Sequence, residues 1–307
     1  MKNIVAVIDV GTLKTKFEVR DYSIDPEGKT IYKDKKLTVM GRDLDKNDNL
    51  ISEKSLNIAV EALKEIKSKM EALKVRRFEA VTTEAIRRAK NSAEILRKIY
   101  EATEIQLTTL SHEEEARILF HSISKDFPTQ VIAVADVGGG SVQLVTGKDK
   151  DIYETHLFKT GTYYLQEEFS ATHHPTAKEL DNAKQYIKRE LASLKMSKKK
   201  PGLLVYGTTN IIEFMSVMKV KMSRDDSCAE HCLFTDVNNL VPVYEKIIKY
   251  SYEDRMSMYP EEPYYMWAAD MALMNIFQIC EYLTIRKIYP SNSNISSGLL
   301  RELSAQK

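Results

Sequence analysis

The chain has 307 residues, 43% of them hydrophobic and 29% charged, with a formal net charge of +1. This length suffices for two domains that each bury a core. The near-neutral charge excludes bulk attraction to nucleic acid or to an anionic membrane, so we expect neither as a partner. The N-terminal apolar run is too short for a signal peptide, and no segment approaches the roughly 20 apolar residues of a membrane span. We therefore expect a cytoplasmic protein.

One pattern occurs twice, and it opens each half of the chain. Residues 5–19 read VAVIDVGTLKTKFEV, and residues 132–146 read IAVADVGGGSVQLVT. Each has an apolar run, Asp-Val-Gly, small or polar residues and a second apolar alternation, which predicts a β-hairpin. Asp9 and Asp136 end the first strands, where a carboxylate can hold Mg²⁺ through water.

A single turn of this kind is ordinary, but a matched pair favours a phosphate site. Glycine permits a tight turn, and successive small residues can point their N–H groups at an anion. The pair therefore predicts duplicated domains that face each other across a phosphate-binding cleft.

Between and after the hairpins, strand and helix patterns alternate, which predicts the α/β class. Ser111 with Glu114, and Thr176 with Glu179, have the spacing of capping boxes at helix starts. In chain order the other expected elements are a strand at 31–40, a helix at 52–75, a strand at 78–81, a helix at 84–103, a strand at 105–110, a helix at 112–123, a strand that ends at Gly207, a helix from Ile211, helices at 238–255 and 266–284, and a strand, loop and helix over 286–303.

We place the domain boundary in the polar segment near residues 122–130. The expected domains are 1–125 and 126–307, and we allow for a C-terminal helix at 296–307 that packs back on the first domain.

The three cysteines are too few, and odd in number, for a disulfide framework. Cys228, His231 and Cys232 resemble half of a zinc site, but no second ligand pair follows. We interpret these cysteines as structural.

Six motifs together resemble one family. They read IDVGTLKTKFEV, VTTEAIRRAKN, LSHEEEARILF, VADVGGGSVQLV, YGTTN and SSGLL, in that order. This order resembles the exopolyphosphatase and guanosine pentaphosphate phosphohydrolase (Ppx/GppA) family, in its short two-domain form. The resemblance implies two ribonuclease H-like domains of the actin, hexokinase and sugar-kinase superfold around a central cleft. It also implies Mg²⁺-dependent hydrolysis of a terminal phosphoanhydride bond.

The resemblance assigns roles residue by residue. Glu115 matches the catalytic base that activates water. Asp9, Asp136 and Gln143 match positions near the metal. The expected phosphate-binding positions are Gly11, Thr12, Lys16, Arg87, Gly138, Gly139, Gly140, Ser141, Gly207 and Thr208, together with Lys14, which departs from the family pattern but adds a cation that could bind an anion.

Two of these assignments have a simpler alternative. By themselves Glu113, Glu114 and Glu115 are acids that the helix dipole favours at a helix start. With the family pattern we assign catalysis to Glu115 and capping to Glu114. Arg87 has two open interpretations, a phosphate contact or a solvated helix face beside Arg88.

The chain also departs from the family pattern. Gln143 replaces a metal-binding Glu, so we expect weaker affinity for a divalent metal. The other departures are Leu13 and Lys14 in the first loop, Tyr164 and Ala268 where Arg is common, and Asn292 and Ser296 in the last loop.

The leading hypothesis is an exopolyphosphatase that acts on inorganic polyphosphate. One alternative is a hydrolase of the 5′-terminal phosphate of guanosine pentaphosphate. Another is a catalytically weak relative that senses nucleotide or phosphate. A homodimer is plausible by resemblance alone.

Overall fold

The computed structural model describes residues 3–26, 28–41, 44, 46–169, 174–196, 199–207, 210–228 and 231–306. It divides into two compact units. The first comprises Met1–Ile118 with Ile295–Lys307, and the second comprises Leu119–Asn294. The chain therefore first passes between the units within a helix, at residue 118, and its last helix belongs to the first unit.

The first unit is built on a five-stranded mixed sheet in the order β3-β2-β1-β4-β5. The first two strands form the predicted antiparallel hairpin, and β4 and β5 continue the sheet in parallel. The elements of this unit are β1 (Ile4–Val10), β2 (Lys14–Asp21), β3 (Lys29–Leu37), α1 (Glu53–Ala72), β4 (Arg77–Thr82), α2 (Glu84–Arg88), α3 (Ser92–Thr103), β5 (Thr108–Thr109), the start of α4 (His112–Ser124) and α12 (Ile295–Ala305).

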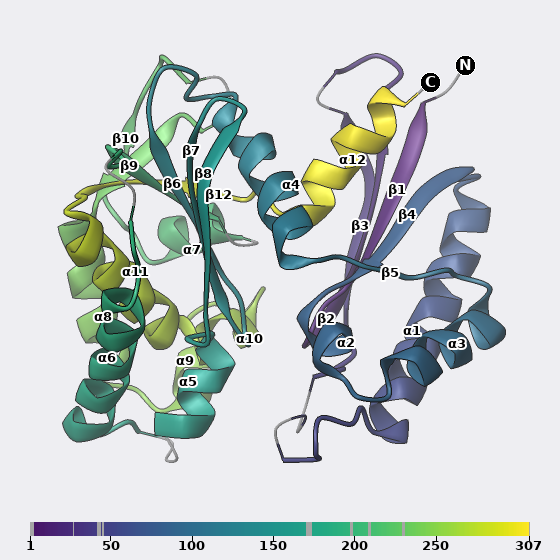
Figure 1. Cartoon of the computed structure of the whole chain (residues 1–307), viewed down its shortest axis with the longest axis horizontal. Helices are drawn as coiled ribbons and strands as arrows, with labels where there is room; N and C mark the ends of the chain where they lie inside the picture. The colour runs from purple at the N-terminus through teal and green to yellow at the C-terminus, as the bar shows by residue number, and fades with distance from the viewer. Residues whose placement is uncertain are drawn as a thin grey trace. The chain divides into compact units, whose positions relative to one another are not determined.

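Alternate residues of β1 supply two different cores, because successive strand side chains point to opposite faces. Ala6 and Ile8 pack with α1 and α3, whereas Val5 and Val7 pack with α12. Figure 1 shows α1 and α3 on one face of this sheet and α12 on the other. A segment from the end of the sequence thus completes the first unit.

The second unit repeats this topology and extends it. Its sheet has the order β10-β11-β12-β9-β6-β7-β8, so β8-β7-β6-β9-β12 corresponds to β3-β2-β1-β4-β5. The elements are the end of α4, β6 (Ile132–Val137), β7 (Val142–Lys148), β8 (Asp151–Phe158), α5 (Thr162–Phe169), α6 (Ala177–Ala192), β9 (Leu203–Gly207), α7 (Ile211–Val217), β10 (Ser223–Arg224), β11 (Leu233–Asp236), the 3₁₀ helix η1 (Val237–Leu240), α8 (Val241–Ile247), α9 (Tyr252–Met256), α10 (Pro263–Trp267), α11 (Ala269–Leu283) and β12 (Lys287–Ser291). The α/β class and the duplicated hairpins are confirmed.

Helices α6, α8 and α11 cover one face of this second sheet (Figure 1). Helix α11 is apolar on most of its circumference and packs against α5, α6 and α8. Its buried Asp270 pairs with buried Arg255, with 2.8 Å between Oδ2 and Nη1. No described helix is both long and apolar enough to cross a bilayer.

Both predicted capping boxes are confirmed. Ser111 Oγ accepts from the Glu114 N–H, and the Glu114 carboxylate accepts from the Ser111 N–H. Thr176 and Glu179 make the same reciprocal pair at the start of α6.

Three predicted elements differ from the structure. The helix expected at 84–103 breaks at Ala89, whose ψ is 126°, because the Asn91 side chain bonds both backbone groups of Ile51. The strand expected at 105–110 is reduced to β5, Thr108–Thr109. The helix expected at 238–255 ends at Ile247 and restarts after Ser251, whose hydroxyl caps α9. The tertiary hydrogen bonds of Asn91 thus interrupt the first of these two helices, and the Ser251 cap divides the second.

Candidate active site

The two glycine turns have the same local geometry in their separate units. The Gly11 N–H donates to the Lys14 carbonyl at 3.0 Å, and the Gly138 N–H donates to the Ser141 carbonyl at the same distance. A Cβ on either glycine would lie 3.1 Å from that carbonyl oxygen. The repeated pattern in the sequence is therefore a repeated turn in space.

In both turns, neighbouring backbone engages the carbonyl groups. The Thr12 carbonyl accepts from the Gly41 N–H, and the Leu13 carbonyl accepts from two further N–H groups, those of Thr38 and Val39. Such engagement ties up acceptors that would repel a phosphate, which suits an anion cradle.

The second turn is engaged in the same way by the start of α5. The Gly138 carbonyl accepts from the Thr162 N–H, and the Gly139 carbonyl accepts from the N–H groups of Tyr163 and Tyr164. Gly161, which sequence reasoning did not single out, allows this approach. A Cβ there would lie 2.2 Å from the carbonyl carbon of Gly140.

The predicted metal carboxylates occupy equivalent places in the two hairpins. Asp9 lies opposite Lys16 in the β1–β2 register, and Asp136 lies opposite Gln143 in the β6–β7 register. Asp9 is 5% exposed, and its Oδ2 lies 3.5 Å from Lys16 Nζ. Lys16, a predicted phosphate ligand, is thus a partner of a predicted metal ligand, whereas Gln143 brings no charge to Asp136.

The third predicted loop begins at Gly207, which pairs with Asp136 in the register of β6 and β9. Strands β6, β9 and β12 run parallel, and Asp136, Gly207 and Ser291 share one register row at their carboxyl ends. Ligands of open α/β sheets bind outside such strand ends. Thr208, the other residue predicted here, lies outside the described residues.

Glu115 lies on the first turn of α4, where Arg87 reaches it from α2. The Arg87 Nη1 donates to Glu115 Oε1 at 2.5 Å and also to the Leu110 carbonyl, and its Nη2 donates to Glu84 Oε2 at 2.9 Å. The Arg87 side chain is 20% exposed and that of Glu115 is 14% exposed. The solvated-face interpretation of Arg87 is therefore wrong, and its contact with phosphate stays a prediction.

Glu84 and His112 join this cluster, and sequence reasoning missed both. His112 Nε2 lies 3.7 Å from the Glu84 carboxylate. Partial burial lowers the pKa of His112, the Arg87 charge lowers it further, and Glu84 opposes the shift. The ring is consequently neutral near pH 7. The sequence signal was the position of His112 inside LSHEEEARILF and of Glu84 inside VTTEAIRRAKN.

The family departures take defined roles in the structure. The Asn292 amide donates to the Glu213 carboxylate at 2.9 and 3.1 Å, which an Asp could not do without repulsion. Tyr164, where Arg is common, has the Lys159 Nζ 4.6 Å from its ring centroid. Asn292 and Tyr164 therefore each make a specific contact of their own in place of the family's usual residue.

The donor atoms near the turns fit Mg²⁺ in a limited way. Among the residues that the structure describes, no three His, Cys, Asp or Glu side chains gather to hold a metal. Mg²⁺ commonly uses one or two carboxylates, waters and substrate phosphates. Each of the two carboxylates, Asp9 in the first unit and Asp136 in the second, therefore suits an ion that binds together with phosphate, not one caged by protein alone.

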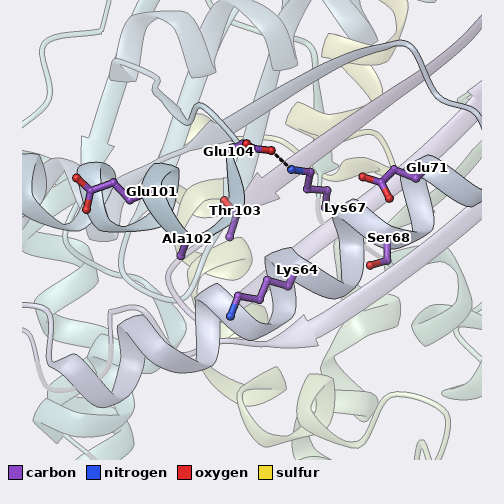
Figure 2. Close-up of a pocket in the computed structure, with 8 residues that line it drawn as sticks. All are labelled: Lys64, Lys67, Ser68, Glu71, Glu101, Ala102, Thr103 and Glu104. Carbon is purple, nitrogen blue, oxygen red and sulfur yellow. Dashed lines mark hydrogen bonds and ion pairs between the residues drawn. The ribbon is translucent and has the colours of Figure 1, made fainter.

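A polar pocket of about 350 Å³ lies away from all these residues, between α1 and α3. Figure 2 shows Lys67 paired with Glu104 across it, beside Lys64, Glu71 and Glu101. Its charges of both signs belong to exposed helix faces, and it contains none of the predicted site residues.

Comparison with known proteins identifies the relatives of this chain. A family model described as the Ppx/GppA phosphatase family matches residues 22–261. The chain is 25% identical over 207 residues to a bifunctional 3-dehydroquinate synthase/phosphatase of Fusobacterium nucleatum, covering 63% of this chain and 31% of that protein. It is 26% identical over 115 residues to exopolyphosphatase 1 of Mycobacterium tuberculosis, covering 37% of this chain and 33% of that protein. The matches thus span about a third of the length of these relatives.

Solved structures agree on the fold. An Aquifex aeolicus Ppx/GppA phosphatase superposes with a TM-score of 0.77 at 22% identity, covering 98% of this chain and 99% of that one. An exopolyphosphatase from Cytophaga hutchinsonii superposes with a TM-score of 0.85 at 17% identity, covering 98% and 97%. These matches confirm the predicted class of two ribonuclease H-like α/β domains.

Proposed function

Because the chain belongs to the Ppx/GppA phosphatase family, we propose that it hydrolyses the terminal phosphoanhydride bond of inorganic polyphosphate. The observation that carries this proposal is the contact between Arg87 and Glu115, 2.5 Å between Nη1 and Oε1. It brings a cation suited to phosphate and a carboxylate suited to water activation into one partly exposed cluster.

Glu115 acts as the general base in this proposal. A phosphoryl group that binds the Arg87 guanidinium competes with Glu115 for its N–H donors, because phosphate oxygens accept the same paired hydrogen bonds. The released carboxylate then lies beside the bound phosphoryl group and takes a proton from the attacking water. Neutral His112 adds no positive charge that would hold Glu115 in its ion pair.

The first glycine turn with Lys14 and Lys16, and the second glycine turn, bind the remaining phosphate oxygens. Phosphoryl transfer depends mainly on positioning and charge neutralisation, which backbone N–H groups, Lys14 and Lys16 provide. Asp9 and Asp136 would hold Mg²⁺, with the Gln143 amide oxygen beside Asp136. When bound, Mg²⁺ would neutralise charge on the phosphoanhydride.

The first experiment measures phosphate release from polyphosphate, guanosine pentaphosphate and ATP, with Mg²⁺ or with EDTA. We expect Mg²⁺-dependent release from polyphosphate. Glu115→Gln should lower kcat by at least about 100-fold, because it removes the base but retains the shape of the side chain.

Glu114→Gln is the matched control. It removes the same charge from the same helical turn, and glutamine can still accept the Ser111 N–H. It should retain nearly full activity. Equal losses in the two variants would refute the role of Glu115, and release from guanosine pentaphosphate alone would refute the proposed substrate.

A further inference from the structure

We propose that Asp126, His231 and Ser291 form a positioning relay that fixes the carboxyl end of β12 beside the phosphate site. The proposal rests on the proposed function, because it concerns the same register row of strand ends. None of the three residues belongs to the motifs that identify the family.

The relay is continuous and buried. Asp126 Oδ2 accepts both from the His231 backbone N–H at 2.7 Å and from Nδ1 of the His231 ring at 2.8 Å. On the other side of the ring, Nε2 lies 2.6 Å from Ser291 Oγ. His231 is 5% exposed and Ser291 is 1% exposed.

The Asp126 contact sets the direction of the hydrogen bonds. A carboxylate oxygen can only accept, so Nδ1 of His231 carries a proton, and the relay that we propose uses the tautomer in which Nε2 is an acceptor. Ser291 must then donate its hydroxyl proton to Nε2. Its lone pairs stay oriented to accept the Ser293 N–H, which lies 3.0 Å from Oγ.

This direction matters because Ser291 begins the segment that lies beside Gly207, where the third predicted loop begins. Ser291 pairs with Gly207, which pairs with Asp136. At about 4.8 Å between neighbouring strands, Ser291 lies two strands, or about 10 Å, from Asp136. The Ser293 carbonyl oxygen would lie 3.6 Å from a Cβ at Gly207, so the segment 291–293 rests on the start of the predicted phosphate loop.

The same geometry excludes Ser291 as a nucleophile. Its order of groups is that of a Ser-His-Asp triad, but a side chain with 1% exposure cannot attack a substrate. Ser291 and His231 therefore act through the loop that they hold, and the loss of either should loosen phosphate binding before it slows the chemical step.

The test compares Ser291→Ala and His231→Gln with Thr235→Val. Thr235 is also buried in the same sheet, 2% exposed, and its hydroxyl donates to the Lys221 carbonyl at 2.7 Å. It lies opposite Ile288, at the other half of β12. Ser291→Ala and Thr235→Val each lose one buried hydroxyl, and His231→Gln loses the ring that joins Asp126 to Ser291, so a general loss of stability affects each of them.

Calorimetry with tripolyphosphate should give a Kd that is about five- to tenfold higher for Ser291→Ala and His231→Gln. Thr235→Val should leave this Kd unchanged despite a comparable fall in Tm. Where turnover is measurable, the two relay variants should raise KM and keep kcat within about twofold. A ¹⁵N spectrum of the wild-type histidines should show His231 protonated at Nδ1 and not at Nε2.

The inference is overturned if Thr235→Val weakens binding as much as Ser291→Ala, or if His231 carries its proton on Nε2. It also fails if the wild type does not bind tripolyphosphate. If the wild type binds tripolyphosphate but releases no phosphate, only the proposed function fails, since the affinities of the variants still test the relay.

Discussion

Gln143 departs from the family pattern at a position whose neighbours the structure defines. It is 6% exposed and lies opposite Asp136 in the register of β6 and β7. Gln143→Glu should lower the Mg²⁺ concentration for half-maximal activity several-fold, because a second carboxylate strengthens binding of a hard cation. A Mg²⁺ titration of phosphate release measures this effect.

The same substitution should destabilise the protein without metal, because two carboxylates would then lie directly opposite each other. Gln185→Glu, on an exposed position of α6, controls for the added negative charge. If Gln143→Glu has the same Mg²⁺ dependence as the wild type, the position beside Asp136 does not belong to the metal site.

The two capping boxes are the elements in which local sequence most directly sets stability. The pKa of Glu114 and that of Glu179 are both lowered, first by the backbone N–H of Ser111 or Thr176 that each carboxylate accepts. A carboxyl group whose pKa is lowered by folding adds stability above its unfolded pKa. That stability is lost as the pH falls through the lower pKa of the folded state.

We therefore expect the variant with both Glu114→Gln and Glu179→Gln to have a lower Tm than the wild type above about pH 5. The two Tm values should converge as the pH falls through the lowered pKa values of the two wild-type carboxyl groups, which then also become neutral. Glu113→Gln removes a charge from the same turn but not from a cap, so it should not reproduce this convergence. A Tm difference that does not depend on pH would contradict the prediction.

The contact between α5 and the second glycine turn gives another prediction at this scale. A Cβ at Gly161 would lie within 2.4 Å of three backbone atoms, in Gly139, Gly140 and Ser141. Gly161→Ala should therefore cost about 1–3 kcal/mol of unfolding free energy and weaken phosphate binding, because the cradle must shift. Denaturant unfolding and calorimetry measure the two effects.

Gly202→Ala is the matched control, because a Cβ there meets no heavy atom within 4 Å. It should change the unfolding free energy by less than about 1 kcal/mol. If Gly161→Ala behaves like Gly202→Ala, α5 does not hold the turn in place.

At the scale of the whole molecule, α12 joins the far end of the sequence to the first unit. Leu300 is fully buried in the cluster with Val5 and Val7. Leu300→Ala should destabilise the first unit by about 2–5 kcal/mol, because it leaves a cavity under β1. Gln306→Ala, on an exposed residue, should have little effect.

The single tryptophan, Trp267, belongs to the second unit and reports on it separately. Leu300→Ala should move the unfolding transition seen by circular dichroism to lower denaturant more than the transition seen by Trp267 fluorescence. Equal shifts of both transitions would show that the two units unfold as one cooperative body.

The candidate site was predictable where its residues lie in short motifs, and not where partners come from distant segments. The turns at Gly11 and Gly138 follow from their own sequence, because each closes a hydrogen bond three residues along the chain. The contact of Arg87 with Glu115 was not predictable, since Glu115 lies 28 residues away on another helix. The break of the helix at Ala89 likewise depends on Ile51, which no local pattern includes.

By itself the sequence determined the duplicated hairpins, the α/β alternation and the capping boxes, because these depend on periodicity and on bonds within a few residues, and its short motifs indicated the family by resemblance. Only the tertiary structure decided that α12 completes the first unit, that Asp136, Gly207 and Ser291 share a row, and that Asp126 orients His231. Those features depend on sheet order and strand register. Such long-range pairings are fixed by the packing of the whole fold, and no local pattern in the sequence predicts them.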